Sequence, residues 1–193
     1  FTATLITEKF KEKKIDIIPF LEIVSLNGTV NLDPFKIEFV TLTHSILEPN
    51  GLKIETPAGN IFHTGDWKCD PNPLVGEKVN SDRLKEIGKK GVLAMICDST
   101  NVFSIGRAGS ESDVRKSMLN IISRLNKRIL VTSFASNVAR METIFYCAEK
   151  TGRLISLVGR SMHRIYKAAK QCGYLQNLIE PIDPREAKKI SRD

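Results

Sequence analysis

The sequence predicts an α/β protein in two parts, with α+β character in the first part. Three observations predict this class. Short alternating segments separated by tight turns dominate the first third, a pattern typical of antiparallel sheet. A continuous apolar run of strand length follows at 91–97. From residue 112 onward, helical and strand-like segments alternate, which indicates βα units and a parallel sheet.

The first part begins with an amphipathic segment, 2–13, that predicts a helix. The turn Asn27-Gly28 separates two strand-like segments, and Pro57–Asn60 is a strong hairpin signal. The first third is therefore expected to form mostly antiparallel sheet. Its predicted strands are 16–24, 28–32, 36–43, 51–56 and 60–65.

A loop rich in Pro, Asp and Lys leads to a short predicted helix around Arg83–Ile87. Ser81 and Asp82 are its candidate caps, and Gly88 or Gly91 ends it. The apolar run that follows is expected to be a strand covered on both faces of its sheet, because it has no polar alternation. This strand delivers Asp98 at its carboxyl end.

The loop Val102–Gly109 marks a change in composition, and we predict the domain boundary there, giving domains 1–104 and 105–193. Beyond the boundary, two strands are expected to alternate with helices, and the last segment resembles a helix that is cut short. The predicted helices are 112–125, 138–150, 162–172 and 185–193, and the predicted strands are 128–132 and 153–158.

Composition limits the classes of protein. The 193 residues are 41% hydrophobic and 26% charged, as in a globular protein, and no apolar run reaches the length of a membrane span. The four cysteines are scattered without a CxxC pair, and no signal peptide is evident, so we expect reduced thiols and a cytoplasmic location. The net charge of +7 weakly favours a polyanionic partner. The first residue is Phe1, not Met, so we expect a fragment of a longer protein.

Two metal-capable side chains follow predicted strands. His44 comes after the segment Ile37–Leu42, and Asp66 after Asn60–Thr64. Loops that leave rigid strands are where a β-scaffold presents ligands. A lone histidine at such a place is more often structural, but the pair predicts a metal site, with Asp98 as a further acid.

Two predicted βα turns carry small hydroxylated residues, one around Ser133–Asn137 and one at Gly159–Ser161. Helix N-termini bind phosphate groups well, and Arg140 and Arg160 could add bidentate contacts. Ser and Asn are also the ordinary helix-capping residues, and taken alone the turns are better explained by capping.

Five short motifs occur in order along the chain. They are Thr43–Ile46, His63–Asp70, Cys97–Asn101, Ser133–Asn137 and Val158–Met162. Together they resemble ribonuclease J, the bacterial branch of the β-CASP nucleases with a metallo-β-lactamase fold. The resemblance implies part of a metallo-β-lactamase αββα sandwich, followed by part of an inserted, Rossmann-like β-CASP domain.

The resemblance also implies roles for individual residues. His44 matches a ligand of one metal, Asp66 the carboxylate that bridges two metals, and Asp98 an acid beside the metals. Asp66 and Asp98 are thus the candidate catalytic residues. The candidate substrate-binding residues lie in the two turns and are Phe134, Ala135, Ser136, Asn137, Arg160 and Ser161.

The implied activity is that of a ribonuclease that uses two zinc ions, with endonuclease and 5′-to-3′ exonuclease action in RNA maturation, including rRNA processing, and decay. The implied partner is RNA, especially RNA with a 5′-monophosphate, and no membrane. The full-length form is expected to be a homo-oligomer, either a dimer or a tetramer.

The chain departs from the family pattern in its metal ligands. The His-x-His-x-Asp-His motif is absent, and the three histidines are His44, His63 and His163. We therefore expect this chain alone to bind zinc poorly and to be inactive. Two alternatives stay open: a non-catalytic RNA- or phosphate-binding relative and, with less support, a small-molecule metallo-hydrolase.

Overall fold

The computed structural model describes residues 1–190, which form two compact units. The sheet unit consists of Phe20–His44 and Glu48–Gly109. The helical unit consists of Phe1–Pro19, Ser45–Leu47 and the chain from Ser110 onward. The presence of a mixed sheet together with helices confirms the predicted α/β class. The predicted domain boundary between residues 104 and 105 stays a prediction.

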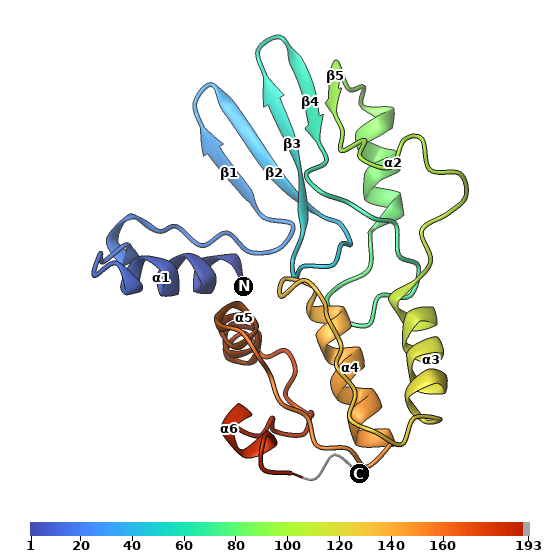
Figure 1. Ribbon diagram of the computed structural model, residues 1–193. Coiled ribbons are helices and arrows are strands. Elements are labelled where there is room, and N and C mark those ends of the chain that lie inside the picture. The colour runs from blue at the N-terminus through green and yellow to red at the C-terminus, as the bar shows by residue number, and fades with distance from the viewer. Residues whose placement is uncertain (191–193) are drawn as a thin grey trace. The chain divides into compact units, whose positions relative to one another are not determined.

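The sheet unit is built on one five-stranded sheet with the order β1-β2-β3-β4-β5. Neighbouring strands from β1 to β4 are antiparallel, and β5 runs parallel to β4 (Figure 1). Antiparallel pairing therefore dominates the first part of the chain, as its alternating pattern predicts. The strands are β1 (Thr29–Leu32), β2 (Phe35–Thr41), β3 (Asn50–Thr56), β4 (Gly59–His63) and β5 (Ala94–Ile96).

Helix α2 (Ser81–Lys89) precedes β5 and packs on the sheet. Its cap differs from the prediction: the side chain of Asn80, rather than Ser81 or Asp82, accepts the backbone N–H of Arg83 at 3.0 Å. Ile87 is buried in a cluster with Val40 of β2 and Phe62 of β4. Burial of these apolar side chains supplies the main attraction between helix and sheet.

The predicted strand 16–24 is wrong. This segment contains only a short 3₁₀ turn, Ile18–Phe20, and its apolar side chains at Ile18, Phe20 and Ile23 are exposed. Pro19 lies inside the segment and has no N–H, so it cannot contribute to a strand ladder. Alternation of apolar residues alone does not form a strand when no neighbouring strand is available to pair with it.

Strand β5 is present as predicted, but its surroundings are not. Ala94, Met95 and Ile96 are all exposed, and β4 is the one strand that pairs with β5 among residues 1–190. The expectation of a strand covered on both faces is therefore wrong for this chain. Among the described residues β5 is therefore an edge strand, although its apolar sequence is typical of a buried strand.

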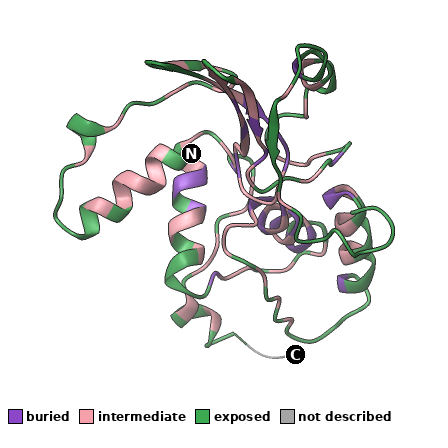
Figure 2. Cartoon of the chain, turned by 90° about the horizontal axis from the view of Figure 1, so that it is seen from above, coloured by how far each residue is buried: buried purple, intermediate pink, exposed green. Residues whose placement is uncertain are grey.

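The helical unit has its core along α4. Its helices are α1 (Thr2–Glu12), α3 (Glu111–Ile122), α4 (Val138–Lys150), α5 (Arg160–Gln171) and α6 (Pro184–Ala187). Phe145 of α4 is fully buried and stacks on Tyr166 of α5, with ring centroids 5.4 Å apart. Figure 2 shows the buried positions in the strands and helices. Within residues 1–190, no helix combines the length and apolar character needed to cross a membrane.

The two strands predicted in the second part, 128–132 and 153–158, are wrong. Both segments are irregular, because neither finds a strand partner among the described residues. Their polar groups bond elsewhere: the carbonyl of Ile155 accepts the N–H of Ile182 at 2.9 Å. The predicted final helix 185–193 is reduced to α6, and residues 191–193 lie outside the described part.

Candidate functional site

The carboxyl ends of β4 and β5 lie side by side in the sheet unit. His63 pairs with Ile96 in register, and the N–H of Thr64 donates to the carbonyl of Ile96 at 2.9 Å. Parallel strands end at the same edge of a sheet, so the loops that follow them leave together. Asp66 and Asp98, the candidate catalytic acids, follow these two ends within a few residues.

Asp98 is held by backbone and side-chain hydrogen bonds. Its N–H donates to the hydroxyl of Thr64 at 3.1 Å, and its carbonyl accepts the indole N–H of Trp67 at 3.3 Å. Its carboxylate accepts the hydroxyl of Thr100 at 2.6 Å and the N–H of Thr100 at 3.0 Å. These two bonds lower the pKa of Asp98 from its ordinary value, and a positive charge on His44 lowers it further. Asp98 is therefore an ionised carboxylate at neutral pH.

His44 is connected to the Asp66 loop through its neighbour Thr43. Thr43 forms an antiparallel bridge with Lys68, whose N–H donates to the Thr43 carbonyl at 2.7 Å. The buried hydroxyl of Thr43 donates to the Lys68 carbonyl and accepts the N–H of Asp70 at 3.1 Å. The bridge brings the chain at His44 beside the loop that contains Asp66. His44, Asp66 and Asp98 thus belong to one group of loops.

His63 has a different local role. Its Nδ1 accepts the N–H of Gly65 at 2.9 Å and so holds the turn that leaves β4. Gly65 has a φ of +59°, and a Cβ there would lie 3.1 Å from the carbonyl of Asn50. The turn therefore needs glycine both for its backbone conformation and for space. In this structure His63 shapes the loop that carries Asp66.

The donor types at this edge suit a metal such as zinc, because zinc binds imidazole nitrogen and carboxylate oxygen. His44 supplies the first kind of donor, and Asp66 and Asp98 the second. Among residues 1–190, however, no group of three or more His, Cys, Asp or Glu side chains is arranged to hold a metal ion. The residues present do not form a complete metal site, and the assignments of His44 and Asp66 as ligands stay predictions.

The turn Ser133–Asn137 opens α4 in the helical unit. The side chain of Asn137 accepts the N–H of Arg140 at 2.8 Å, which makes Asn137 the helix cap. The carbonyl of Phe134 accepts the N–H of Asn137 at 3.0 Å, and the Phe134 ring is 85% exposed. Capping thus accounts for Asn137, whereas Phe134 presents an aromatic ring to solvent. Ala135 and Ser136 are half-buried between them.

Arg140, a candidate for a phosphate contact, makes an ion pair in this structure. Its guanidinium donates to both carboxylate oxygens of Glu111, at 3.1 and 3.2 Å. Glu111 is buried at the start of α3, so the pair ties α3 to α4. An arginine that already makes a bidentate ion pair has few donors left for a ligand.

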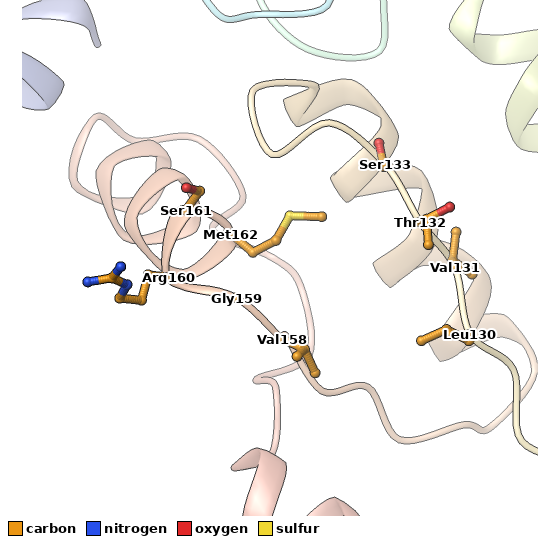
Figure 3. Close-up of a pocket in the computed structure, with 9 residues that line it drawn as sticks. All are labelled: Leu130, Val131, Thr132, Ser133, Val158, Gly159, Arg160, Ser161 and Met162. Carbon is orange, nitrogen blue, oxygen red and sulfur yellow. The ribbon is translucent and has the colours of Figure 1, made fainter.

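The second turn borders a pocket of about 460 Å³ in the helical unit. The pocket lies between segments Leu130–Ser133 and Val158–Met162 (Figure 3). Arg160 and Ser161 line it, but Figure 3 shows the guanidinium of Arg160 pointing away from the facing segment and Met162 pointing towards it. Helix α5 begins here after Gly159, a cap residue without a side chain, so the first N–H groups of the helix receive no side-chain cap.

The predicted site residues therefore fall into two sets. His44, Asp66 and Asp98 belong to the sheet unit, and the six candidate substrate-binding residues belong to the helical unit. Of these six, Arg160 and Ser161 line the pocket, and the residues of the first turn do not.

Sequence reasoning missed Thr43 and Thr64, which tie the strand-end loops together, and Thr100, which holds the Asp98 carboxylate within its own loop. Each threonine directly flanks, or lies two residues from, a predicted site residue. Proximity in sequence is the one signal that could have found them. The partners of Thr43 and Thr64 lie in other loops, so these hydrogen bonds cannot be read from local sequence.

Comparison with known proteins defines the class first. Residues 126–193 match the family model described as "Ribonuclease J, beta-CASP domain". The chain is also similar over its full length to a solved structure, a protein of unknown function from Enterococcus faecalis V583, with a TM-score of 0.63 and 18% identity. That structure is covered to 50% of its length, and at this identity it supports the fold alone. Residues 126–193 are thus similar to the β-CASP domain of ribonuclease J.

The chain as a whole is similar to proteins named ribonuclease J. It is 38% identical to "Ribonuclease J" of Sinorhizobium meliloti over 100% of this chain and 34% of that protein. It is also 38% identical to the proteins of that name from Thermus thermophilus, over 74% of this chain and 25% of that protein, and Corynebacterium glutamicum, over 91% and 24%. The chain therefore spans about a quarter to a third of the length of these relatives.

Proposed function

We propose that this chain is part of a metal-dependent ribonuclease of the ribonuclease J type. The observation that carries the proposal is the strand-end group in the sheet unit, in which His44, Asp66 and Asp98 lie on neighbouring loops. The chain also has relatives named ribonuclease J. A histidine and two carboxylates on loops tied together by hydrogen bonds suit hydrolysis of a phosphodiester.

In this proposal His44 and Asp66 contribute to a zinc centre that needs further ligands from the longer protein. A bound zinc pair would supply an activated water for attack on the phosphodiester. The chain's own part is to hold His44 and Asp66 on neighbouring loops and to keep Asp98 ionised beside them. By itself, the 193-residue chain is expected to be inactive.

The helical unit would contact the RNA backbone. The uncapped start of α5, with Ser161 beside it, offers backbone N–H groups and a hydroxyl to a phosphate. Phe134 is exposed and could stack on a base, a contact that tolerates any sequence. The proposed substrates are therefore RNA chains, particularly those with a 5′-monophosphate, cleaved with little sequence preference.

The test uses the full-length protein that contains this chain. We expect it to cleave 5′-monophosphorylated RNA, to lose this activity in the presence of a metal chelator, and to act more slowly on RNA with a 5′-hydroxyl. Asp66→Ala should reduce the cleavage rate by about 100-fold or more, because it removes a carboxylate that is proposed to hold the metal. The measurement is product formation over time on a labelled RNA.

Asp82→Ala is the matched control. Asp82 is an exposed carboxylate on α2 that pairs with Lys85, so its loss should leave cleavage unchanged. Full activity of Asp66→Ala would contradict the assigned role of Asp66. RNA binding without any cleavage by the wild-type protein would favour the non-catalytic alternative.

A further inference from the structure

Thr64 connects the two loops that carry the candidate acids. Its hydroxyl accepts the N–H of Asp98 at 3.1 Å and donates to the carbonyl of Gly65 at 2.7 Å. Its own N–H donates to the carbonyl of Ile96 at 2.9 Å, at the end of β5. Two of these three hydrogen bonds join the β4 exit to the β5 exit, and the third holds the turn after Thr64.

The setting of Thr64 makes these bonds hard to replace. The residue is 3% exposed, so water has little access to its hydroxyl if a bond breaks. A second bond connects Asp98 to the loop that carries Asp66: the indole N–H of Trp67 donates to the carbonyl of Asp98. This bond is longer, at 3.3 Å, and does not involve the N–H of Asp98. In this structure the Thr64 hydroxyl is the group that receives the backbone N–H of Asp98.

We propose that Thr64 is a positioning residue that sets the place of Asp98 relative to Asp66. This inference rests on the proposed function, in which the two acids act on the same RNA. Thr64 does not touch the substrate in this scheme. Its hydroxyl holds the backbone N–H of Asp98. Its place in the chain, two residues before Asp66, connects it directly to the loop that carries Asp66. Displacements of about 1 Å in such groups change catalytic rates strongly.

The alternative is a purely structural role, in which Thr64 only stabilises the fold. A buried hydroxyl with hydrogen bonds contributes to stability wherever it is, so a loss of stability cannot distinguish the two roles. The distinguishing measurements are the division of the effect between kcat and KM, rescue by a residue that keeps the hydroxyl, and the local exposure of the Asp98 amide.

The experiment compares Thr64→Val and Thr64→Ser in the full-length protein. Valine keeps the shape and removes the hydroxyl, so we expect kcat for RNA cleavage to fall about 10- to 100-fold with KM changed less than about 3-fold. Serine keeps the hydroxyl and should restore most of kcat. Hydrogen exchange should become faster in the segment that contains the Asp98 amide for Thr64→Val, and stay close to wild type for Thr64→Ser.

Thr56→Val is the matched control, because Thr56 lies at the other end of the same β3–β4 hairpin. Its hydroxyl donates to the carbonyl of Gly59 at 2.8 Å and accepts the N–H groups of Ala58 and Gly59 at 3.1 and 3.2 Å. Thr56→Val therefore loses comparable hydrogen bonds in the same element. It should change thermal stability without changing kcat or exchange at Asp98.

Three results would overturn the proposal: an unchanged kcat in Thr64→Val, equal losses in the valine and serine variants, or a loss of kcat in Thr56→Val as large as in Thr64→Val. The proposed function fails separately, through a wild-type protein that does not cleave RNA. In that case the exchange measurement still reports whether Thr64 holds Asp98: unchanged exchange in Thr64→Val removes the positioning role as well.

Discussion

At the scale of single residues, short hydrogen bonds control the charge of the carboxylates. Glu38 on β2 accepts the Nε–H of Arg83 from α2 at 2.6 Å, and this bond lowers the pKa of Glu38 from its ordinary value. Asp98 shows the same effect with a neutral donor, Thr100. The two carboxylates have different structural roles. Glu38 connects α2 to the sheet through Arg83, whereas Asp98 lies just after β5 in the candidate site.

The Glu38–Arg83 pair gives a pH dependence with a definite sign. The pKa of Glu38 is lower in the folded state, so its contribution to stability is fully present above the unfolded pKa and is lost as the pH falls through the folded pKa. Glu38→Gln should therefore lower the free energy of unfolding by about 1 kcal/mol at neutral pH and by less in acid. Urea unfolding at pH 7 and pH 3 measures both values.

Glu86 provides the control for this pair. It also accepts Arg83, at 2.8 Å, but it is much more exposed than Glu38. Glu86→Gln should change stability less than Glu38→Gln, because solvent screens the exposed pair. An equal effect of both substitutions, at both pH values, would contradict the role given to Glu38.

At the scale of elements, the attachment of α2 to the sheet positions β5 and hence Asp98. Ile87 of α2 is 3% exposed and packs with Val40 and Phe62. The chain runs from α2 directly into β5, so the site depends on this packing although no site residue lies in the helix.

Ile87→Ala tests this attachment. Removing a buried side chain of this size should lower the free energy of unfolding by about 2–4 kcal/mol, because it loses apolar burial and leaves a cavity. Ile121→Ala on α3 is the control: Ile121 is largely exposed, so its loss should cost less than about 1 kcal/mol. Chemical denaturation measures both variants, and similar small losses would show that Ile87 does not hold the helix.

The elements differ in how well sequence predicts them. The hairpin strands and the helices are predicted from period and turn residues, because those signals are local. The segments 16–24, 128–132 and 153–158 carry strand-like composition but are not strands, because a strand also needs a neighbour. The places of His44, Asp66 and Asp98 after strands could also be predicted, while their roles in a site stay predictions. The hydrogen bond of the Thr64 hydroxyl could not be predicted, since its partner Asp98 lies in another loop.

At the scale of the whole chain, apolar surface is left uncovered. Met95 and Ile96 of β5, and Leu93 just before it, are exposed, and β5 has no strand partner other than β4 among the described residues. Edge strands with apolar side chains readily pair with other chains. The net charge of +7 opposes such association at long range, and salt screens that repulsion.

The 193-residue chain should therefore self-associate through β5. Met95→Lys should reduce the associated fraction, because a charged side chain on an edge strand disfavours pairing. Lysine in place of Ile121, an exposed apolar residue on α3, is the control and should have little effect. Sedimentation velocity at low and high salt measures the distribution, and a monomer at both salt concentrations would contradict the prediction.

The parallel pairing of β4 with β5 also bears on the order in which the chain folds. Short turns connect β1 to β2 and β3 to β4, whereas the segment between β4 and β5 is long and contains α2. Closing a longer loop costs more chain entropy, and contacts between distant parts of the sequence slow folding. We therefore expect the hairpins to form first and the hydrogen bond between Thr64 and Asp98 to form later. Of the residues proposed for chemistry, Asp98 would be the last to reach its place.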